Sequence, residues 1–211
     1  MPDLTTARQL MVDSQLRARG ISDQRVLDAM LRVPRHQFVP ETHRAAAYED
    51  HPLPIGDGQT ISQPYIVALM LESLELSVAD KVLEVGTGSG YVTALLAELA
   101  GQVFSIERRA TLAAVARNIL ATLGYGNVQI FTGDGTFGLP AGAPFDAILV
   151  SAAAAGLPSP LLAQLRDGAR MMIPIGSPDS QQLQFIRMVK GRPVISLREQ
   201  VRFVPLIPGQ E

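Results

Sequence analysis

The sequence changes rhythm at Lys81, and this change restricts the fold more than any other feature. Beyond it, short apolar runs alternate with longer amphipathic segments. The runs are VLEVG, VFSIE, VQIF, FDAILV and MMIPIG, and the predicted helices cover about 90–99, 112–123 and 160–166. Strands that alternate with such helices predict βαβ units and a parallel sheet covered on both faces. LQFIRMVKG and VRFVPLI have no helix between them, so we expect an antiparallel strand pair at the end.

The part before Lys81 has a helical pattern instead. From about Leu4 to Glu75, apolar residues recur at intervals of three and four, and glycines and prolines interrupt the pattern. A chain of 211 residues with 47% apolar content is long enough to bury one substantial core. We therefore expect one domain over 1–211, with a helical N-terminal extension over 1–75 and an α/β core over 76–211.

Composition argues against several classes of function. The chain has no cysteine, which excludes disulfides, thiolate metal sites and a cysteine nucleophile. Its net charge of -2 combines 18 basic and 20 acidic residues in mixed order, so we expect no nucleic-acid partner. No window approaches the ~18 apolar residues of a membrane span, and no signal peptide is recognisable. We expect a cytoplasmic monomer that binds no membrane. The three histidines lack metal-ligand spacing, so we also expect no metal site.

A glycine-rich junction follows the first predicted strand of the core. In VLEVGTGSGY, Gly86, Gly88 and Gly90 remove side chains from the turn, so main-chain N–H groups can approach a ligand. Glu107 ends the next predicted strand, about 20 residues later, the offset at which an acid binds a ribose diol. Together they predict a site for a nucleoside-containing cofactor. The alternative is a tight turn beside a solvated carboxylate.

Two details narrow the choice of nucleoside. A dinucleotide fingerprint needs its third glycine at position 91, where this chain has Tyr91, so the motif disfavours NAD. FTGDG places a second acid, Asp134, at the end of the third predicted strand, where it could accept a hydrogen bond from an adenine amine. An ordinary Asp-Gly turn is the alternative interpretation.

These motifs resemble those of S-adenosylmethionine-dependent methyltransferases. More narrowly, VLDAMLRVPRHQFVP, PIGDGQTISQPYIVALM, APFDAILVSAAA and VRFVPL are similar in order and spacing to bacterial protein-L-isoaspartate O-methyltransferases, from about Met11 to Leu206. The resemblance implies a Rossmann-like, seven-stranded, mostly parallel sheet and S-adenosylmethionine as cofactor. The residues it assigns to that cofactor are Thr60, Ile61, Ser62, Glu84, Gly86, Thr87, Gly88, Gly90, Glu107, Arg108, Asp134 and Gly135.

The resemblance also distributes these residues along the cofactor. It implies that Glu84 and Gly86 lie near the methionine end, Glu107 at the ribose, and Asp134 with Gly135 at the adenine. It places Ser62 at the active centre, and Val204 and Leu206 beside the substrate peptide.

Ser62 has two possible roles from its position alone. Pro64 favours the first turn of a helix, and Ser62 precedes it where a capping residue is expected. A small hydroxyl behind the flexible Gly56–Gly58 segment would also suit a lid that holds a substrate oxygen. The two roles are compatible.

Three functions remain possible. The first is methylation of isoaspartyl residues in damaged proteins and peptides, which are then the partners and are repaired through a succinimide. The second is methylation of a carboxylate on a dedicated peptide or small molecule. The third is a cofactor-binding module without turnover, against which the presence of Ser62, Glu107 and Asp134 argues. A carboxylate substrate is ionised at neutral pH, so either reaction needs no general base.

Overall fold

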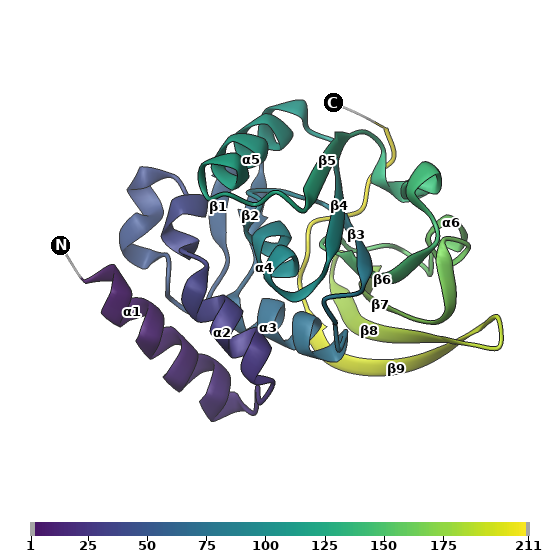
Figure 1. The fold of residues 1–211 in the computed structure, drawn as a ribbon, viewed down its shortest axis with the longest axis horizontal. Coiled ribbons are helices and arrows are strands. Elements are labelled where there is room, and N and C mark those ends of the chain that lie inside the picture. Colours follow the sequence, from purple (N-terminus) through teal and green to yellow (C-terminus); the bar gives the residue numbers. More distant parts are fainter. Residues whose placement is uncertain (1–2, 210–211) are drawn as a thin grey trace.

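The computed structural model describes residues 3–209; residues 1–2 and 210–211 of the expected domain lie outside the described residues. Within this range one seven-stranded sheet has the order β5-β4-β3-β6-β7-β8-β9 (Figure 1). The strands from β5 to β7 are parallel, and β8 and β9 are antiparallel, as the sequence predicts. The strands are β3 (Lys81–Val85), β4 (Gln102–Glu107), β5 (Val128–Thr132), β6 (Phe145–Val150), β7 (Leu165–Ser177), β8 (Ser180–Val189) and β9 (Arg192–Val201).

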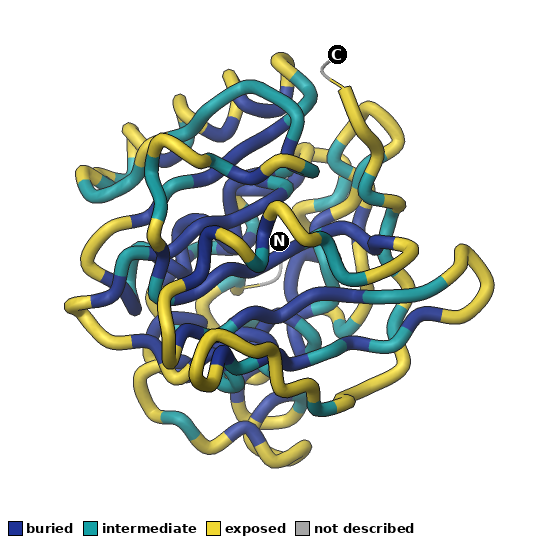
Figure 2. The backbone as a smooth tube through the Cα atoms, turned by 90° about the vertical axis from the view of Figure 1, so that its right-hand side faces the viewer, coloured by how far each residue is buried: buried dark blue, intermediate teal, exposed yellow. Residues whose placement is uncertain are grey.

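The helices cover the two faces unequally. The α-helices are α1 (Leu4–Leu10), α2 (Gln24–Arg32), α3 (Pro64–Ser73), α4 (Tyr91–Leu99), α5 (Ala110–Thr122) and α6 (Ser159–Leu162). The other helical segments are the π-helix η1 (Met11–Leu16) and the 3-10 helices η2 (Arg17–Arg19), η3 (Arg35–Phe38), η4 (Glu41–Ala46), η5 (Gly135–Phe137) and η6 (Pro140–Gly142). The N-terminal helices and α4 pack on one face, and α6 packs on the other. In Figure 2 the inner stretches of the chain are buried, and the loops at the periphery are exposed.

Side chains of β3 alternate between these two faces. Val82 joins the core beneath α4, whereas Leu83 and Val85 join the core beneath α6 at 0% and 1% exposure. Because successive side chains of a strand point to opposite faces, Leu83 and Val85 share one face and the residues between and before them share the other. Glu84 therefore shares the face of Val82, beneath α4.

A small hairpin interrupts the otherwise helical N-terminal extension. Strands β1 (Leu53–Gly56) and β2 (Gln59–Ile61) pair antiparallel around a turn in which Asp57 has a φ of +50°. The expected Gly56–Gly58 turn is therefore the tip of a hairpin. The Thr111 hydroxyl of α5 donates to Asp57 Oδ2 at 2.5 Å, so α5 holds this tip.

The C-terminal prediction needs two corrections. The strand that pairs with β8 is Arg192–Val201, not the predicted VRFVPLI segment, which continues beyond it as an irregular strip. Pro205 lacks the N–H that a regular strand would use, and it forms only an isolated bridge to Ala153. The helix predicted at 160–166 ends at Leu162, because β7 already begins at Leu165.

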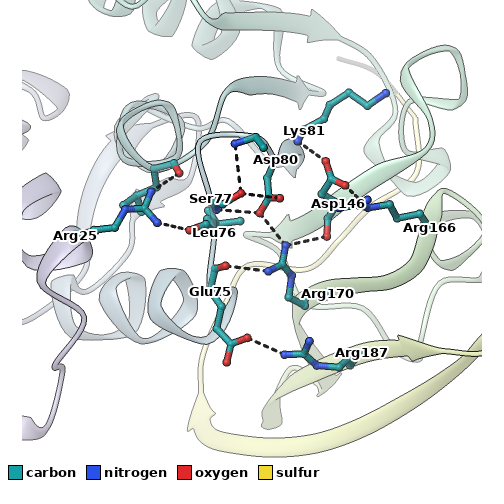
Figure 3. Close-up of polar contacts among 12 residues, drawn as sticks. Arg25, Glu75, Leu76, Ser77, Asp80, Lys81, Asp146, Arg166, Arg170 and Arg187 are labelled. Atoms are coloured by element: carbon teal, nitrogen blue, oxygen red, sulfur yellow. Dashed lines mark hydrogen bonds and ion pairs between the residues drawn. The ribbon is translucent and has the colours of Figure 1, made fainter.

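A charged network joins the amino ends of the central strands (Figure 3). Arg170 of β7 donates to Asp80 Oδ2 and to the Glu75 carbonyl at 2.8 and 2.9 Å. Asp146 of β6 accepts from the Lys81 N–H and forms an ion pair with Arg166. These contacts fix the sheet at the edge opposite the carboxyl ends of its parallel strands. No helix within residues 3–209 combines the length and the apolar character that crossing a membrane requires.

Candidate active site

A cleft opens where the carboxyl ends of β3, β4 and β6 meet. Strand order reverses between β3 and β6, and open α/β sheets bind ligands outside such a reversal. The cleft is lined by 58–62, 85–89, 91–92, 106–109, 135, 151–152 and 204–207. Six segments that are distant in sequence therefore surround one space. Of the predicted site residues, it brings together Thr60, Ile61, Ser62, Gly86, Thr87, Gly88, Glu107, Arg108, Gly135, Val204 and Leu206, and leaves out Glu84, Gly90 and Asp134.

The turn after β3 depends on glycine. Gly86 has a φ of +94°, and an added Cβ would lie 3.5 Å from the Ser151 Cβ. A side chain here would strain the main chain at the mouth of the cleft. Gly90 does not line the cleft; its φ is +89°, and an added Cβ would lie 3.1 Å from Ala116 of α5. Gly90 therefore serves the packing of α5 behind the turn.

Glu107 lies directly against this turn. Its Oε2 accepts from the Gly88 N–H at 2.9 Å, and its Oε1 accepts from the Arg109 N–H at 3.0 Å. The residue is 6% exposed, yet it lines the cleft. Each carboxylate oxygen can accept more than one hydrogen bond, so both retain capacity for a pair of ligand hydroxyls.

Glu84 does not reach the cleft. It is completely buried, and its Oε2 accepts from Thr93 and Ser105 at 2.5 and 2.6 Å. The Ser105 hydroxyl also shares a hydrogen bond of 2.5 Å with Thr87, which does line the cleft. Glu84 thus ends a hydrogen-bonded chain that fixes the glycine turn from below. Burial raises the pKa of Glu84 to about 8, against the opposing effect of these hydrogen bonds.

Of the two site residues predicted after β5, Gly135 lines the cleft and Asp134 does not. Gly135 lines the cleft, where an added Cβ would meet Val85 Cγ1 at 2.6 Å, so only glycine fits. Asp134 does not line it; the carboxylate accepts from Thr136 N–H at 2.9 Å and from Gly209 N–H at 2.7 Å. Burial raises its pKa, but the hydrogen bonds from Gly209 and Thr136 outweigh burial and leave the pKa lowered.

Ser62 lies in the cleft and does not cap α3. The helix begins at Pro64 after Gln63, and no side chain caps it. The capping interpretation of Ser62 is therefore wrong, because Pro64 at the first helical position moves the cap one residue beyond Ser62. The Ser62 carbonyl accepts from the buried Arg35 guanidinium at 2.8 Å. Thr60 and Ile61 precede it on β2.

The C-terminal strip closes the cleft on the side of β6. The Ala153 N–H donates to the Val204 carbonyl at 2.8 Å, and the Leu206 N–H donates to the Ala153 carbonyl at 2.7 Å. The Gln181 side chain holds Phe203 by its N–H and its carbonyl, at 2.6 and 3.0 Å. The strip is thus a short, well-fixed edge.

The sequence did not identify two residues near this cleft, Tyr91, which lines it, and Arg35, which contacts Ser62 and Tyr91. Tyr91, considered only as evidence against NAD, begins α4 and lines the cleft with 1% exposure. Its position directly after the glycine turn could have identified it. Arg35 gave no signal, because a basic residue beside Pro34 is expected at a surface turn, whereas here it is fully buried.

We expect Ser62→Ala to lower turnover at least tenfold without lowering stability, because Ser62 lines the cleft and does not cap α3. The measurement is the turnover number at saturating cofactor, with thermal unfolding of the same sample. Ser77→Ala is the matched control. The Ser77 hydroxyl donates a hydrogen bond of 3.2 Å to the Asp80 carboxylate, and Ser77 does not line the cleft. It should lose stability and keep turnover. Equal turnover in Ser62→Ala and the native protein would remove Ser62 from the reaction.

Known proteins resemble this chain over nearly its whole length. Residues 6–211 match the family described as protein-L-isoaspartate(D-aspartate) O-methyltransferase. Proteins named protein-L-isoaspartate O-methyltransferase from Koribacter versatilis and Roseiflexus castenholzii are 56% and 54% identical to this chain. The aligned regions cover 99% and 98% of this chain and 96% and 94% of theirs.

Solved structures of the same kind share the fold. A protein-L-isoaspartate O-methyltransferase superposes with a TM-score of 0.85 at 29% identity, over 94% of this chain and 65% of its own length. A putative one from Plasmodium falciparum, solved with S-adenosyl-L-homocysteine, gives 0.83 at 27% identity over 98% of this chain and 99% of its own. The chain therefore belongs to the protein-L-isoaspartate(D-aspartate) O-methyltransferase family.

Proposed function

We propose that this protein transfers the methyl group of S-adenosylmethionine to the free α-carboxylate of L-isoaspartyl residues in damaged proteins and peptides. The observation that carries the proposal is the near-complete alignment with relatives of that name, in a chain whose corresponding segments surround one cleft. The Plasmodium falciparum structure contains S-adenosyl-L-homocysteine, the demethylated form of this cofactor.

The residues of the cleft suit that cofactor. Glu107 would accept the ribose hydroxyls, Gly86 to Gly88 would lie along the methionine end, and Gly135 would lie against the adenine. Asp134 would reach the adenine amine only beside the Gly209 N–H that it already binds. Glu84 would act indirectly, by fixing Thr87 through Ser105. Ile61 and Arg108 would complete the walls.

Bound S-adenosylmethionine supplies an electrophilic methyl group on a sulfonium. A carboxylate is already ionised at neutral pH, so the protein needs no residue to remove a proton. Its residues must instead hold one carboxylate oxygen in line with the methyl group and exclude water. Ser62, which lines the cleft, would orient that carboxylate, and the hairpin tip held by Thr111 would cover the cleft. The methyl ester then yields a succinimide when the next main-chain nitrogen attacks it and methanol leaves.

The C-terminal strip would bind the peptide main chain. The Val204 carbonyl and the Leu206 N–H already bond Ala153. If the alternation of an extended strand continues along this strip, the Pro205 carbonyl and the Ile207 N–H would face away from Ala153. These groups would pair with an extended substrate whatever its side chains. Val204 and Leu206 would border it.

The wider assignment follows the sequence. We propose one methyltransferase domain, with the strip 60–62 of its N-terminal extension contributing to the α/β core, acting as a cytoplasmic monomer on isoaspartyl proteins. The near-neutral net charge of -2 supports the proposal that neither nucleic acid nor membrane is a partner.

A panel of unrelated isoaspartyl peptides tests this function. A site that reads main-chain groups should methylate most of the panel, with kcat/KM values that differ by less than about tenfold. Transfer of labelled methyl groups and release of methanol on ester collapse are measured together. Methylation of one peptide alone would favour a dedicated substrate, and cofactor binding without transfer to any peptide would favour a binding module.

A further inference from the structure

We infer that Arg35 is a positioning residue for the methyl-transfer reaction, acting through Ser62. Its Nη2 donates to the Ser62 carbonyl at 2.8 Å, and its Nε donates to the Ala47 carbonyl at 2.8 Å. The guanidinium therefore ties the strip that carries Ser62 to the turn after η4. The inference rests on the proposed function, because it assigns Arg35 a part in that reaction.

The burial of Arg35 is costly, and no carboxylate forms an ion pair with it in the described part of the chain. The residue is 0% exposed, and within residues 3–209 it forms no ion pair. Its Nη1 is buried without a hydrogen-bond partner. Burial lowers the pKa of Arg35 to about 10, so it stays charged at neutral pH. An apolar side chain of similar size would cost less to bury, so stability alone does not explain an arginine here.

The contacts of Arg35 with residues that line the cleft explain better why an arginine occupies this position. Its guanidinium carbon lies 5.0 Å from the centre of the Tyr91 ring, a cation–π contact. Tyr91 begins α4 immediately after the glycine turn and lines the cleft. Arg35 thus contacts two sides of the cleft, one at Ser62 before α3 and the other at Tyr91 in α4. In-line transfer depends on the relative position of these two sides, and a displacement of about 1 Å can reduce rate on the order of a hundredfold.

A second group of contacts holds the neighbouring residue. The Gln63 amide donates to Asp50 Oδ2 at 2.9 Å, and Arg19 forms an ion pair with the same oxygen at 2.7 Å. Because these contacts keep the start of α3 in place, Arg35→Lys should displace Ser62 locally without releasing the helix. Lysine keeps the charge but lacks the fork that binds two carbonyls at once.

A double-mutant cycle between Arg35→Lys and Ser62→Ala tests the inference. In the native background, Arg35→Lys should lower kcat about tenfold and change the affinity for S-adenosyl-L-homocysteine less than threefold. In the Ser62→Ala background, the same change should lower kcat less than twofold, because the hydroxyl that Arg35 positions is gone. Equal reductions in both backgrounds would overturn the inference.

Arg170→Lys is the matched control for general loss of stability. Arg170 is also an arginine that donates to a main-chain carbonyl, with a side chain that is only 13% exposed, but it lies at the opposite edge of the sheet (Figure 3). It should lose stability and keep kcat within twofold. A similar loss of kcat in Arg170→Lys would also overturn the inference. If Arg35→Lys does not fold, Arg35→Gln replaces it in the cycle; failure of both would show a purely structural role and overturn it.

The cycle separates this inference from the function on which it rests. If the native protein does not methylate isoaspartyl peptides, the proposed function fails and the inference with it. If the native protein does methylate them and the two changes are additive, only the role of Arg35 fails.

Discussion

Glu84→Gln should remove most of the pH dependence of stability between about pH 4.5 and pH 8. The pKa of Glu84 is raised from 4.5 to about 8 by burial, so the folded protein holds a proton that the unfolded chain releases. Below pH 4.5 the carboxyl is neutral in both states and costs nothing. As pH rises, the free energy of unfolding should fall by about 1.4 kcal/mol per unit until about pH 8, and then level off.

Glutamine resembles the neutral acid and cannot ionise. The difference in unfolding free energy between variant and native protein should therefore be small at pH 4.5 and reach several kcal/mol at pH 8, in favour of the variant. Urea unfolding at a series of pH values measures it. Glu75→Gln is the control, because the Glu75 side chain is 65% exposed, and the native slope should persist there. A variant less stable than the native protein at pH 8 would show that Glu84 is folded in its charged form.

Glu107→Ala should weaken binding of S-adenosylmethionine and its demethylated product by about 10- to 100-fold. This corresponds to roughly 1–3 kcal/mol, the range for losing hydrogen bonds to a charged group. The variant also loses the acceptors that hold the Gly88 and Arg109 N–H groups, so the turn itself becomes less ordered. Titration calorimetry measures the affinity directly.

Glu72→Ala is the matched control for Glu107→Ala. Glu72 likewise accepts from two main-chain N–H groups, those of Ser22 and Asp23, both at 2.7 Å, but it does not line the cleft. It should lose stability and keep its affinity. Unchanged affinity in Glu107→Ala would exclude Glu107 from the cofactor site, and equal weakening in both variants would show that the effect is indirect.

Much of the fold was predictable because strand and helix periods are local properties of the sequence. The alternation after Lys81 predicted the parallel sheet, and the rule that ligands bind at strand ends predicted where its cleft would be. The β1–β2 hairpin was not predictable in this way, because its strands are too short to show a period. The strand β9 ends at Val201, although the sequence predicted a strand over 201–207. The C-terminal strip leaves the sheet there because it contacts Ala153 and Gln181, which are distant in sequence.

The candidate site divides along the same line. Residues in turns at strand ends, such as Gly86, Glu107 and Gly135, lie where the sequence placed them. Glu84 does not line the cleft, because it lies within β3, one residue before the last residue of the strand. The alternation of the strand directs its side chain beneath α4. The burial of Arg35 depends on tertiary packing alone, because the residues that contact it, Ala47, Ser62 and Tyr91, come from three separate segments. No local pattern reports such a position.

The central claim is that the cleft selects a carboxylate by its distance from the peptide main chain, and one pair of peptides tests it. The two peptides share a sequence and differ at one position, which is isoaspartyl in one and aspartyl in the other. The aspartyl carboxylate stands one methylene farther from the main chain than the isoaspartyl carboxylate does. With labelled S-adenosylmethionine, we expect kcat/KM for the isoaspartyl peptide to exceed that for its twin by at least about a hundredfold, since a misplacement of about 1 Å has that cost. Comparable methylation of the two peptides, or of neither, would contradict the account.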